Sequence, residues 1–125
     1  MTILDNIKTF LVGRSAAQSE DILFNHDDFT DENRIVLSVK DGGFCDVGLK
    51  SVLTADVKNF SMETALTLAD TLYNLLCPPK NYSKPFMLIN DIVLTKTLKP
   101  PVYKEKEKNG RYVVSFELLV ISPRV

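Results

Sequence analysis

The residues that could bind a metal lie between positions 25 and 33, where the sequence reads NHDDFTDEN. This segment brings together one imidazole and four carboxylates, on His26, Asp27, Asp28, Asp31 and Glu32. An EF-hand loop needs ligands at alternating positions, a central glycine and a terminal glutamate, and this segment lacks that pattern. We therefore interpret it as a solvated acidic loop. His26 is interpreted as a surface residue, because no nucleophile is paired with it in the sequence.

The two glycines that follow Asp41 could form part of a phosphate-binding loop. The sequence around Gly42 and Gly43 lacks the lysine and the serine or threonine of a P-loop. It also lacks the third glycine of a dinucleotide-binding fingerprint. We interpret residues 41–43 as a turn, because glycine adopts positive φ at low cost.

Cys45 and Cys77 are too few for a zinc site without further ligands, and the sequence has no CxxC or HxxxH pair. The apolar start of the chain is broken by Asp5, Asn6 and Lys8, so we expect no secretory signal and a reducing compartment. Free thiols are favoured there, with a disulfide as the alternative. The carboxylates cluster in loops without a paired nucleophile and base, so the sequence predicts no enzyme, no metal and no cofactor.

A charged segment between positions 99 and 111, KPPVYKEKEKNGR, is the least core-like part of the chain. Pro100 and Pro101 cannot donate to a strand ladder, and Asn109-Gly110 is typical of a type I′ turn, so we expect a projecting loop. Cations beside tyrosines can bind nucleic acid, but Glu105 and Glu107 cancel much of the field. We favour a solvated or protein-contacting loop, which could cross onto a neighbouring subunit, with nucleic acid as the alternative. The candidate interface residues are Tyr103, Lys104, Glu105, Lys106, Glu107, Lys108 and Arg111.

Length and composition are those of one globular domain spanning residues 1–125. Hydrophobic residues make up 45% and charged residues 25% of the chain, which argues against disorder. The 15 basic and 16 acidic residues give a formal charge of −1, so nucleic acid or membrane would have to be contacted locally. The longest apolar runs are far too short to span a membrane.

One helix organises the rest of the chain, between Ser61 and Cys77. Apolar residues recur there at spacings of three and four, Ser61 is a good N-cap, and Pro78 and Pro79 end the helix. We expect Leu66, Leu72, Tyr73 and Leu76 to contribute most to the core.

The remaining elements are an N-terminal helix and several strands. The helix begins at Thr2 and ends at Gly13 as a left-handed cap. Strands are expected at 22–24, 35–40, 51–58, 86–98 with an interruption near 89–92, and 112–121. The last is expected in a central position, because one of its faces is apolar and the other is half apolar. This order predicts an α+β two-layer sandwich, a mostly antiparallel sheet with the main helix and the N-terminal helix packed on one face.

In the order of its helices and strands the chain resembles the tail terminator family of long-tailed bacteriophages, also labelled minor capsid proteins. The resemblance rests on the starting helix TILDNIKTFLVG, the strand SVLTADVKN before the helix SMETALTLADTLYNLL, a proline-bearing loop, and the final NGRYVVSFELLVI strand.

The resemblance implies an α+β structural protein of the virion, made in the host cytoplasm, that forms a hexameric ring at the head–tail junction. Such a ring ends the tail tube and joins it to the head connector or stopper, and DNA passes through it; no membrane is involved. Residues 103–111 would then correspond to the loop that contacts a neighbouring subunit or the tube. The alternatives are another head-completion or adaptor protein of the same junction, or a nucleic-acid-binding module.

Overall fold

The computed structural model describes residues 3–27, 32–45, 48–76 and 94–123. Within these ranges the order of helix, strands, helix and strands is as predicted. In chain order the elements are α1 (Ile3–Gly13), the short 3-10 helix η1 (Ser19–Asp21), β1 (Ile22–Phe24), β2 (Arg34–Cys45), β3 (Gly48–Asn59), α2 (Met62–Leu76), β4 (Leu94–Lys106) and β5 (Tyr112–Pro123).

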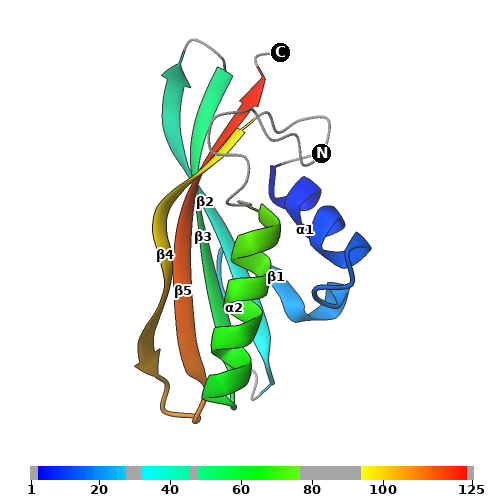
Figure 1. The fold of residues 1–125 in the computed structure, drawn as a ribbon, viewed down its shortest axis with the longest axis vertical. Helices are drawn as coiled ribbons and strands as arrows, with labels where there is room; N and C mark the ends of the chain where they lie inside the picture. Colours follow the sequence, from blue (N-terminus) through cyan, green and yellow to red (C-terminus); the bar gives the residue numbers. More distant parts are fainter. Residues whose placement is uncertain (1–2, 28–31, 46–47, 77–93, 124–125) are drawn as a thin grey trace.

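The five strands form one mixed sheet in the order β1-β2-β3-β5-β4. β1 is parallel to β2, and the other three neighbouring pairs are antiparallel. Figure 1 shows α1 and α2 on the same side of this sheet. The predicted α+β class is confirmed, and β5 takes the interior position expected from its one apolar and one half-apolar face.

Alternate strand residues point toward the helices and form the core. Leu37, Ala55 and Phe116 share one row of the register and are almost fully buried. Each large apolar side chain buried in this way stabilises the fold by about 1.5–3 kcal/mol. The core also contains Leu4, Ile7 and Leu11 of α1 and Ala65, Ala69, Leu72 and Leu76 of α2.

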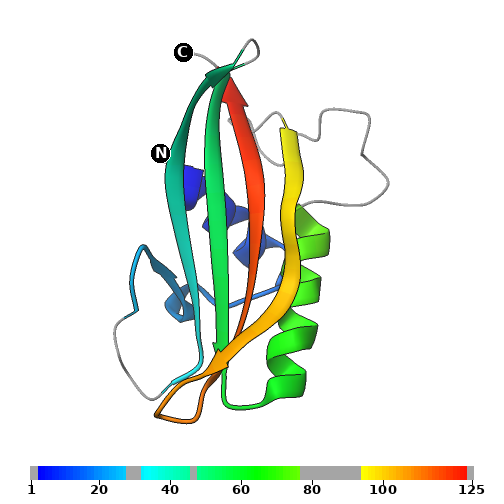
Figure 2. The ribbon, with the colours of Figure 1, turned by 90° about the vertical axis from the view of Figure 1, so that its left-hand side faces the viewer.

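The intervening strand residues point to the other side of the sheet, which faces the viewer in Figure 2. We call this side the open face; in the described part of the chain no helix covers it. Its residues include Val36, Ser38, Thr54, Asp56, Ser115 and Glu117.

Helix α1 ends in a Schellman motif, and the left-handed residue is Ser15. Ser15 has φ of 58°, its amide donates to the carbonyl of Val12 at 3.0 Å, and the amide of Ala16 donates to the carbonyl of Leu11 at 3.1 Å. The prediction of a left-handed cap at Gly13 is wrong, because the helical hydrogen bonds continue to Arg14 before the chain reverses.

Helix α2 begins as predicted at Ser61, whose hydroxyl accepts a hydrogen bond from the amide of Thr64 at 3.3 Å. Leu72 and Leu76 are buried, but Leu66 is 39% exposed, so its predicted core role is wrong. The buried stripe at this end of the helix consists of Ala65 and Ala69. These small residues let the helix approach the sheet closely, which leaves Leu66 at the rim.

Strand β2 continues through the predicted turn at residues 41–43, so that prediction is wrong. The pairing of β2 with β3 shifts by one position between Asp41 and Gly43, and then continues to Cys45 opposite Gly48. Gly43 has φ of 86°. Glycine's freedom therefore serves a β-bulge here.

Strand β4 replaces most of the projecting loop predicted for residues 99–111. It pairs with β5 as far as Lys106, and the register shifts three times, between Thr97 and Lys99, between Lys99 and Val102 where the two prolines stand, and between Tyr103 and Glu105. The loop prediction is wrong because a strand at the edge of a sheet tolerates prolines, whose missing N–H groups need no partner there.

Several predictions concern residues outside the described ranges. They are the cap at Thr2, the acidic residues Asp28 and Asp31, the thiol of Cys77, the loop 78–85 and the first part of the strand 86–98. No helix among the described residues is long and apolar enough to cross a membrane.

Candidate interaction surface

The hairpin that joins β4 to β5 turns over a three-residue loop. The amide of Gly110 donates to the carbonyl of Glu107 at 2.9 Å, and the amide of Glu107 donates to the carbonyl of Arg111 at 2.8 Å. Gly110 has φ of 97°, whereas Asn109 is not left-handed. A type I′ turn needs positive φ at both central residues, so the predicted turn type is wrong. The observed loop is a tight turn followed by a left-handed glycine, and the side chain of Asn109 accepts from the amide of Arg111 at 3.1 Å.

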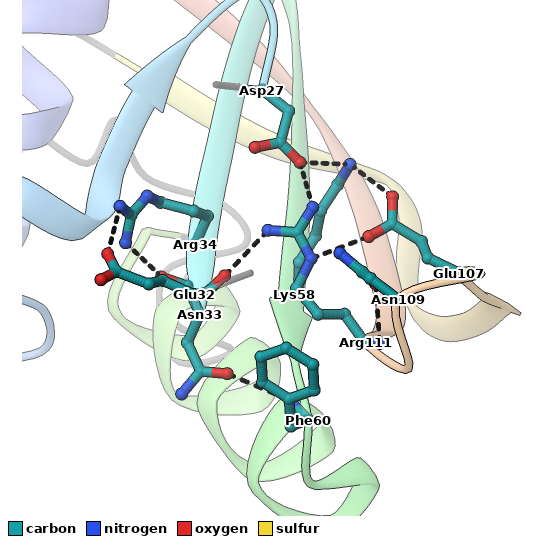
Figure 3. Close-up of polar contacts among 9 residues, drawn as sticks. All are labelled: Asp27, Glu32, Asn33, Arg34, Lys58, Phe60, Glu107, Asn109 and Arg111. Carbon is teal, nitrogen blue, oxygen red and sulfur yellow. Dashed lines mark hydrogen bonds and ion pairs between the residues drawn. The ribbon is translucent and has the colours of Figure 1, made fainter. Parts of the chain in front are cut away.

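This hairpin brings together four charged side chains from three separate parts of the chain (Figure 3). Arg111 donates through Nη2 to Asp27 Oδ2 at 2.5 Å and through Nε to Glu107 Oε1 at 2.9 Å. Lys58 Nζ lies 3.1 Å from Asp27 Oδ2 and 3.0 Å from Glu107 Oε2. We call Asp27, Lys58, Glu107 and Arg111 the ion cluster. Two cations and two carboxylates make it electrically neutral.

The ion cluster lies on the open face of the sheet. Lys58 pairs directly with Val113 across β3 and β5, and Arg111 precedes Val113 by two positions, so these side chains share one face. Val113 is buried although it points away from the helices. The ion cluster therefore covers one end of the open face.

Arg111 is 2% exposed, and its guanidinium is fully engaged. Its third contact runs from Nη1 to the backbone carbonyl of Glu32 at 2.8 Å. Desolvating an arginine is costly unless its hydrogen-bonding groups find partners, and here they do. Arg111 thus joins the hairpin to the acidic segment that precedes β2.

Lys58 retains its charge in this setting. Burial by itself lowers the pKa of Lys58, but the hydrogen bonds and negative charges of Glu107 and Asp27 outweigh it and raise the pKa above its usual value of 10.5. The ammonium group is therefore part of the ion cluster at all physiological pH values.

A second set of contacts fixes the same segment to α2. Arg34 pairs with Glu32 at 2.6 Å and more loosely with Asp21 at 3.5 Å. The side chain of Asn33 accepts from the amide of Phe60 at 3.0 Å, just before the helix begins. Residues 32–34 are thus held by both the ion cluster and the start of α2, as Figure 3 shows.

The structure divides the seven candidate interface residues into two groups. Glu107 and Arg111 belong to the ion cluster, so the interface role expected for Arg111 conflicts with its burial. Tyr103, Lys104, Glu105, Lys106 and Lys108 are exposed on β4 and the loop that follows it.

Aromatic contacts order the exposed group. The ring of Tyr103 meets that of Tyr112 edge to face, with centroids 6.3 Å apart, and Lys106 Nζ lies 5.1 Å from the centroid of Tyr112. These side chains therefore have preferred positions before any partner binds.

The acidic segment also differs from its prediction. Asp27 is buried within the ion cluster, so the interpretation of the whole segment as a solvated loop is wrong for this residue, whereas His26 is exposed. The sequence offered no local signal for Asp27, because its partners lie 31 and 84 positions away. In the described ranges no three His, Cys, Asp or Glu side chains are arranged to hold a metal.

A cavity of about 760 Å³ lies between the end of α1, η1 and the start of β2. Its lining mixes Val12, Leu68 and Ile35 with the charged side chains of Asp21 and Arg34. The guanidinium of Arg34 already has carboxylate partners there, and among the described residues no buried side-chain N or O atom lacks a hydrogen-bond partner.

Comparison of the chain with models of protein families gives no match, and comparison with curated proteins gives none either. The functional proposal therefore rests on the resemblance in the sequence and on the geometry of the hairpin.

Proposed function

We propose that this chain is a structural virion protein of the tail terminator type, located at the head–tail junction of a long-tailed phage. Copies of the chain form a ring, proposed to be hexameric, that ends the tail tube and joins it to the head connector or stopper. DNA passes through the ring without being read. The proposal includes the two-layer α+β sandwich of that family, which is supported by the position of both helices on one side of the sheet (Figure 1).

One observation carries the proposal. The hairpin with the family-like sequence Asn109-Gly110-Arg111 is fixed at its base by a buried ion cluster, while its outer strand is exposed. Fixing a contact surface in advance lowers the entropic cost of association. A subunit that must join a ring in one orientation benefits from such a fixed edge.

Catalysis is not part of the proposal. In the described part of the chain, the clustered charges satisfy one another instead of facing an open cleft, and Lys58 has its pKa raised, away from the range useful for a base.

Nucleic-acid binding remains the second candidate because of a specific observation. Glu107 turns inward to Lys58 and Arg111, so it does not neutralise its exposed neighbours as the sequence suggests. Lys104, Lys106 and Lys108 then face solvent with only Glu105 among them. The exposed edge is therefore more basic than the sequence pattern implies, and phosphate groups are attracted to such an edge.

Solution mass by light scattering over a series of protein concentrations, with negative-stain imaging of any large species, tests the first proposal. A ring of defined size is the expected result. Addition of the chain to the polymerising tail-tube protein of the same phage should arrest tube growth. A chain that stays monomeric and leaves tube growth unchanged would overturn the proposal.

Titration with labelled duplex and single-stranded DNA separates the two candidates. A nucleic-acid-binding module should bind with an affinity that falls steeply as salt rises, and Lys104→Ala with Lys106→Ala should reduce the salt slope by about 2. A tail terminator should show no such binding under conditions in which it forms rings.

A further inference from the structure

The two outer strands of the sheet, β1 and β4, have residues in the same rows of the strand register. Successive pairings place Ile22 of β1 opposite Ile35 of β2, and carry the same row across the sheet to Tyr103 of β4. The next row runs from Leu23 to Val102. Among the described residues, β1 pairs only with β2 and β4 only with β5, so each has one free side. The complete first row is Ile22, Ile35, Val57, Val114 and Tyr103.

The direction of these strands permits pairing between copies. β1 is parallel to β2, while β4 is antiparallel to β5, which is itself antiparallel to β3. β3 is antiparallel to β2, so β4 and β1 run in opposite directions. A second copy moved sideways in the plane of the sheet would therefore place its β1 antiparallel to β4 of the first. Figure 2 shows the two strands at opposite sides of the sheet.

The two edges carry opposite charges at matching heights. Below Tyr103, β4 presents the exposed side chains of Lys104 and Lys106. Just before β1, η1 presents Glu20, which is exposed, and Asp21, which is partly exposed. Asp21 reaches Arg34, and the row of Arg34 continues through Lys58 and Val113 to Glu105 of β4, which is also exposed. Lys104 and Lys106 flank Glu105, so this part of β4 has a net positive charge at the rows where η1 is acidic.

Apolar residues and prolines determine which part of β4 can pair with a strand of another copy. Val102 is 56% exposed and Tyr103 39%, so this part of the edge leaves apolar surface uncovered. Pro100 and Pro101 stand directly above, and proline cannot donate to a strand on the free side. Strand pairing is therefore limited to a short stretch of β4 that begins at Val102, and the shift in register between Tyr103 and Glu105 shortens its regular part further.

From these observations we infer that copies of this chain associate head to tail, with β4 of one copy against β1 and η1 of the next. The contact pairs Val102 and Tyr103 with the backbone of β1, and Lys104 and Lys106 with the acidic side chains of η1. Two different surfaces meet in this contact, so it is heterologous and builds a ring when the rotation between copies closes. This inference rests on the proposed ring and names the surfaces that form it.

Charge reversal on each edge separately tests the contact. Variant one carries Lys104→Glu and Lys106→Glu, and variant two carries Glu20→Lys and Asp21→Lys. In each variant alone, like charges face each other at every contact, so self-association should weaken by at least about tenfold. In an equimolar mixture each reversed edge meets an edge of opposite charge, so assembly should return.

The matched control carries Lys40→Glu and Lys50→Glu, the same change in charge on rows of β2 and β3 beyond the three that pair with β1. Its self-association should equal that of the unchanged chain. Circular dichroism and the midpoint of thermal unfolding check that every variant is folded, and recovery in the mixture is an independent proof of folding.

Each other outcome overturns the inference in a recognisable way. If variant two assembles normally while variant one does not, β4 meets β4 of the partner copy and the contact is not head to tail. If both variants assemble normally, the ring uses other surfaces and the proposed function still stands. If the unchanged chain is monomeric up to millimolar concentration, the inference is wrong, and arrest of tube growth alone then decides the proposed function.

Discussion

The two faces of the sheet are closed by different physical means. On the helix-covered face, hydrocarbon side chains from α1, α2 and four strands, β1, β2, β3 and β5, exclude water. On the open face, one end is covered by the neutral ion cluster of Asp27, Lys58, Glu107 and Arg111. Apolar contacts are individually replaceable, whereas each charge in the ion cluster is stable there only because the others are present. On the open face, the loss of one side chain should therefore also destabilise the charges that remain, an effect that a lost apolar side chain does not have.

The replacement Arg111→Ala should have the largest effect. After this replacement only Lys58 balances the two carboxylates of the ion cluster, Asp27 and Glu107. Breaking a buried ion pair lowers the unfolding free energy by about 3–5 kcal/mol. Denaturant unfolding measures this loss. Lys108→Ala removes an exposed cation from the same loop and should change stability by about 0.5 kcal/mol or less.

Adding Asp27→Asn to Arg111→Ala sharpens the test. The remaining charged pair, Lys58 and Glu107, is then neutral again, so the double variant should be more stable than the sum of the two single losses predicts. Strict additivity, or a loss below about 1 kcal/mol for Arg111→Ala, would show that the four side chains do not act as a unit.

On the helix-covered face, Leu72→Ala should lower the unfolding free energy by about 2–5 kcal/mol, because it leaves a cavity in place of a fully buried side chain. The control is Leu66→Ala, the same change on the same helix at a residue that is 39% exposed, which should cost about 0.5 kcal/mol or less. Equal losses for the two variants would mean that α2 packs on the sheet through a different face.

The sequence predicted the helix-covered face much better than the open face. Periodic apolar residues depend on local geometry, so the buried positions of Leu72 in α2 and of alternate residues in β5 could be inferred from spacing alone. The ion cluster has no such spacing, because Asp27 and Arg111 meet only through the fold, 84 positions apart. Charges that looked like solvated loop residues are therefore partly internal.

Turns and bulges were predicted less well for a related reason. Gly43 and Gly110 both adopt positive φ, as glycines in turns do, but one lies in a β-bulge and the other ends a three-residue loop. Local sequence indicates where the backbone needs glycine, not which structure uses it. Pro100 and Pro101 likewise indicated a loop, since the sequence does not reveal that β4 is an edge strand.

The loop that positions Glu107 and Arg111 can be tested without changing a charge. Gly110→Ala forces a side chain into left-handed backbone with φ of 97° and should cost about 1–2 kcal/mol. The nearest atoms to the added Cβ are on the ring of Phe60 at 3.7 Å, which is ordinary contact, so the cost comes from the backbone. Gly13→Ala, where φ is not positive and nothing lies within 4 Å, should instead stabilise the protein by about 0.4–1 kcal/mol.

The smallest expected effect is the contribution of Lys58 to the unfolding free energy, which should change only at alkaline pH. A pH dependence is expected for the open face and not for the helix-covered face. The pKa of Lys58 is raised above 10.5 in the folded protein, so its contribution is complete at neutral pH and is lost as the pH rises past 10.5 through the folded value. Lys58→Arg keeps the positive charge throughout this range, since guanidinium does not deprotonate.

The unfolding free energy of the unchanged chain should therefore fall relative to that of Lys58→Arg as the pH rises above about 10.5. The two proteins share every other titratable group, so the difference between them isolates position 58. Chemical denaturation at a series of pH values measures it, and Leu72→Ala compared with the unchanged chain should show a difference that is independent of pH. Parallel curves for Lys58→Arg and the unchanged chain would mean that Lys58 is not held in the ion cluster, and that Arg111 alone joins the hairpin to Asp27.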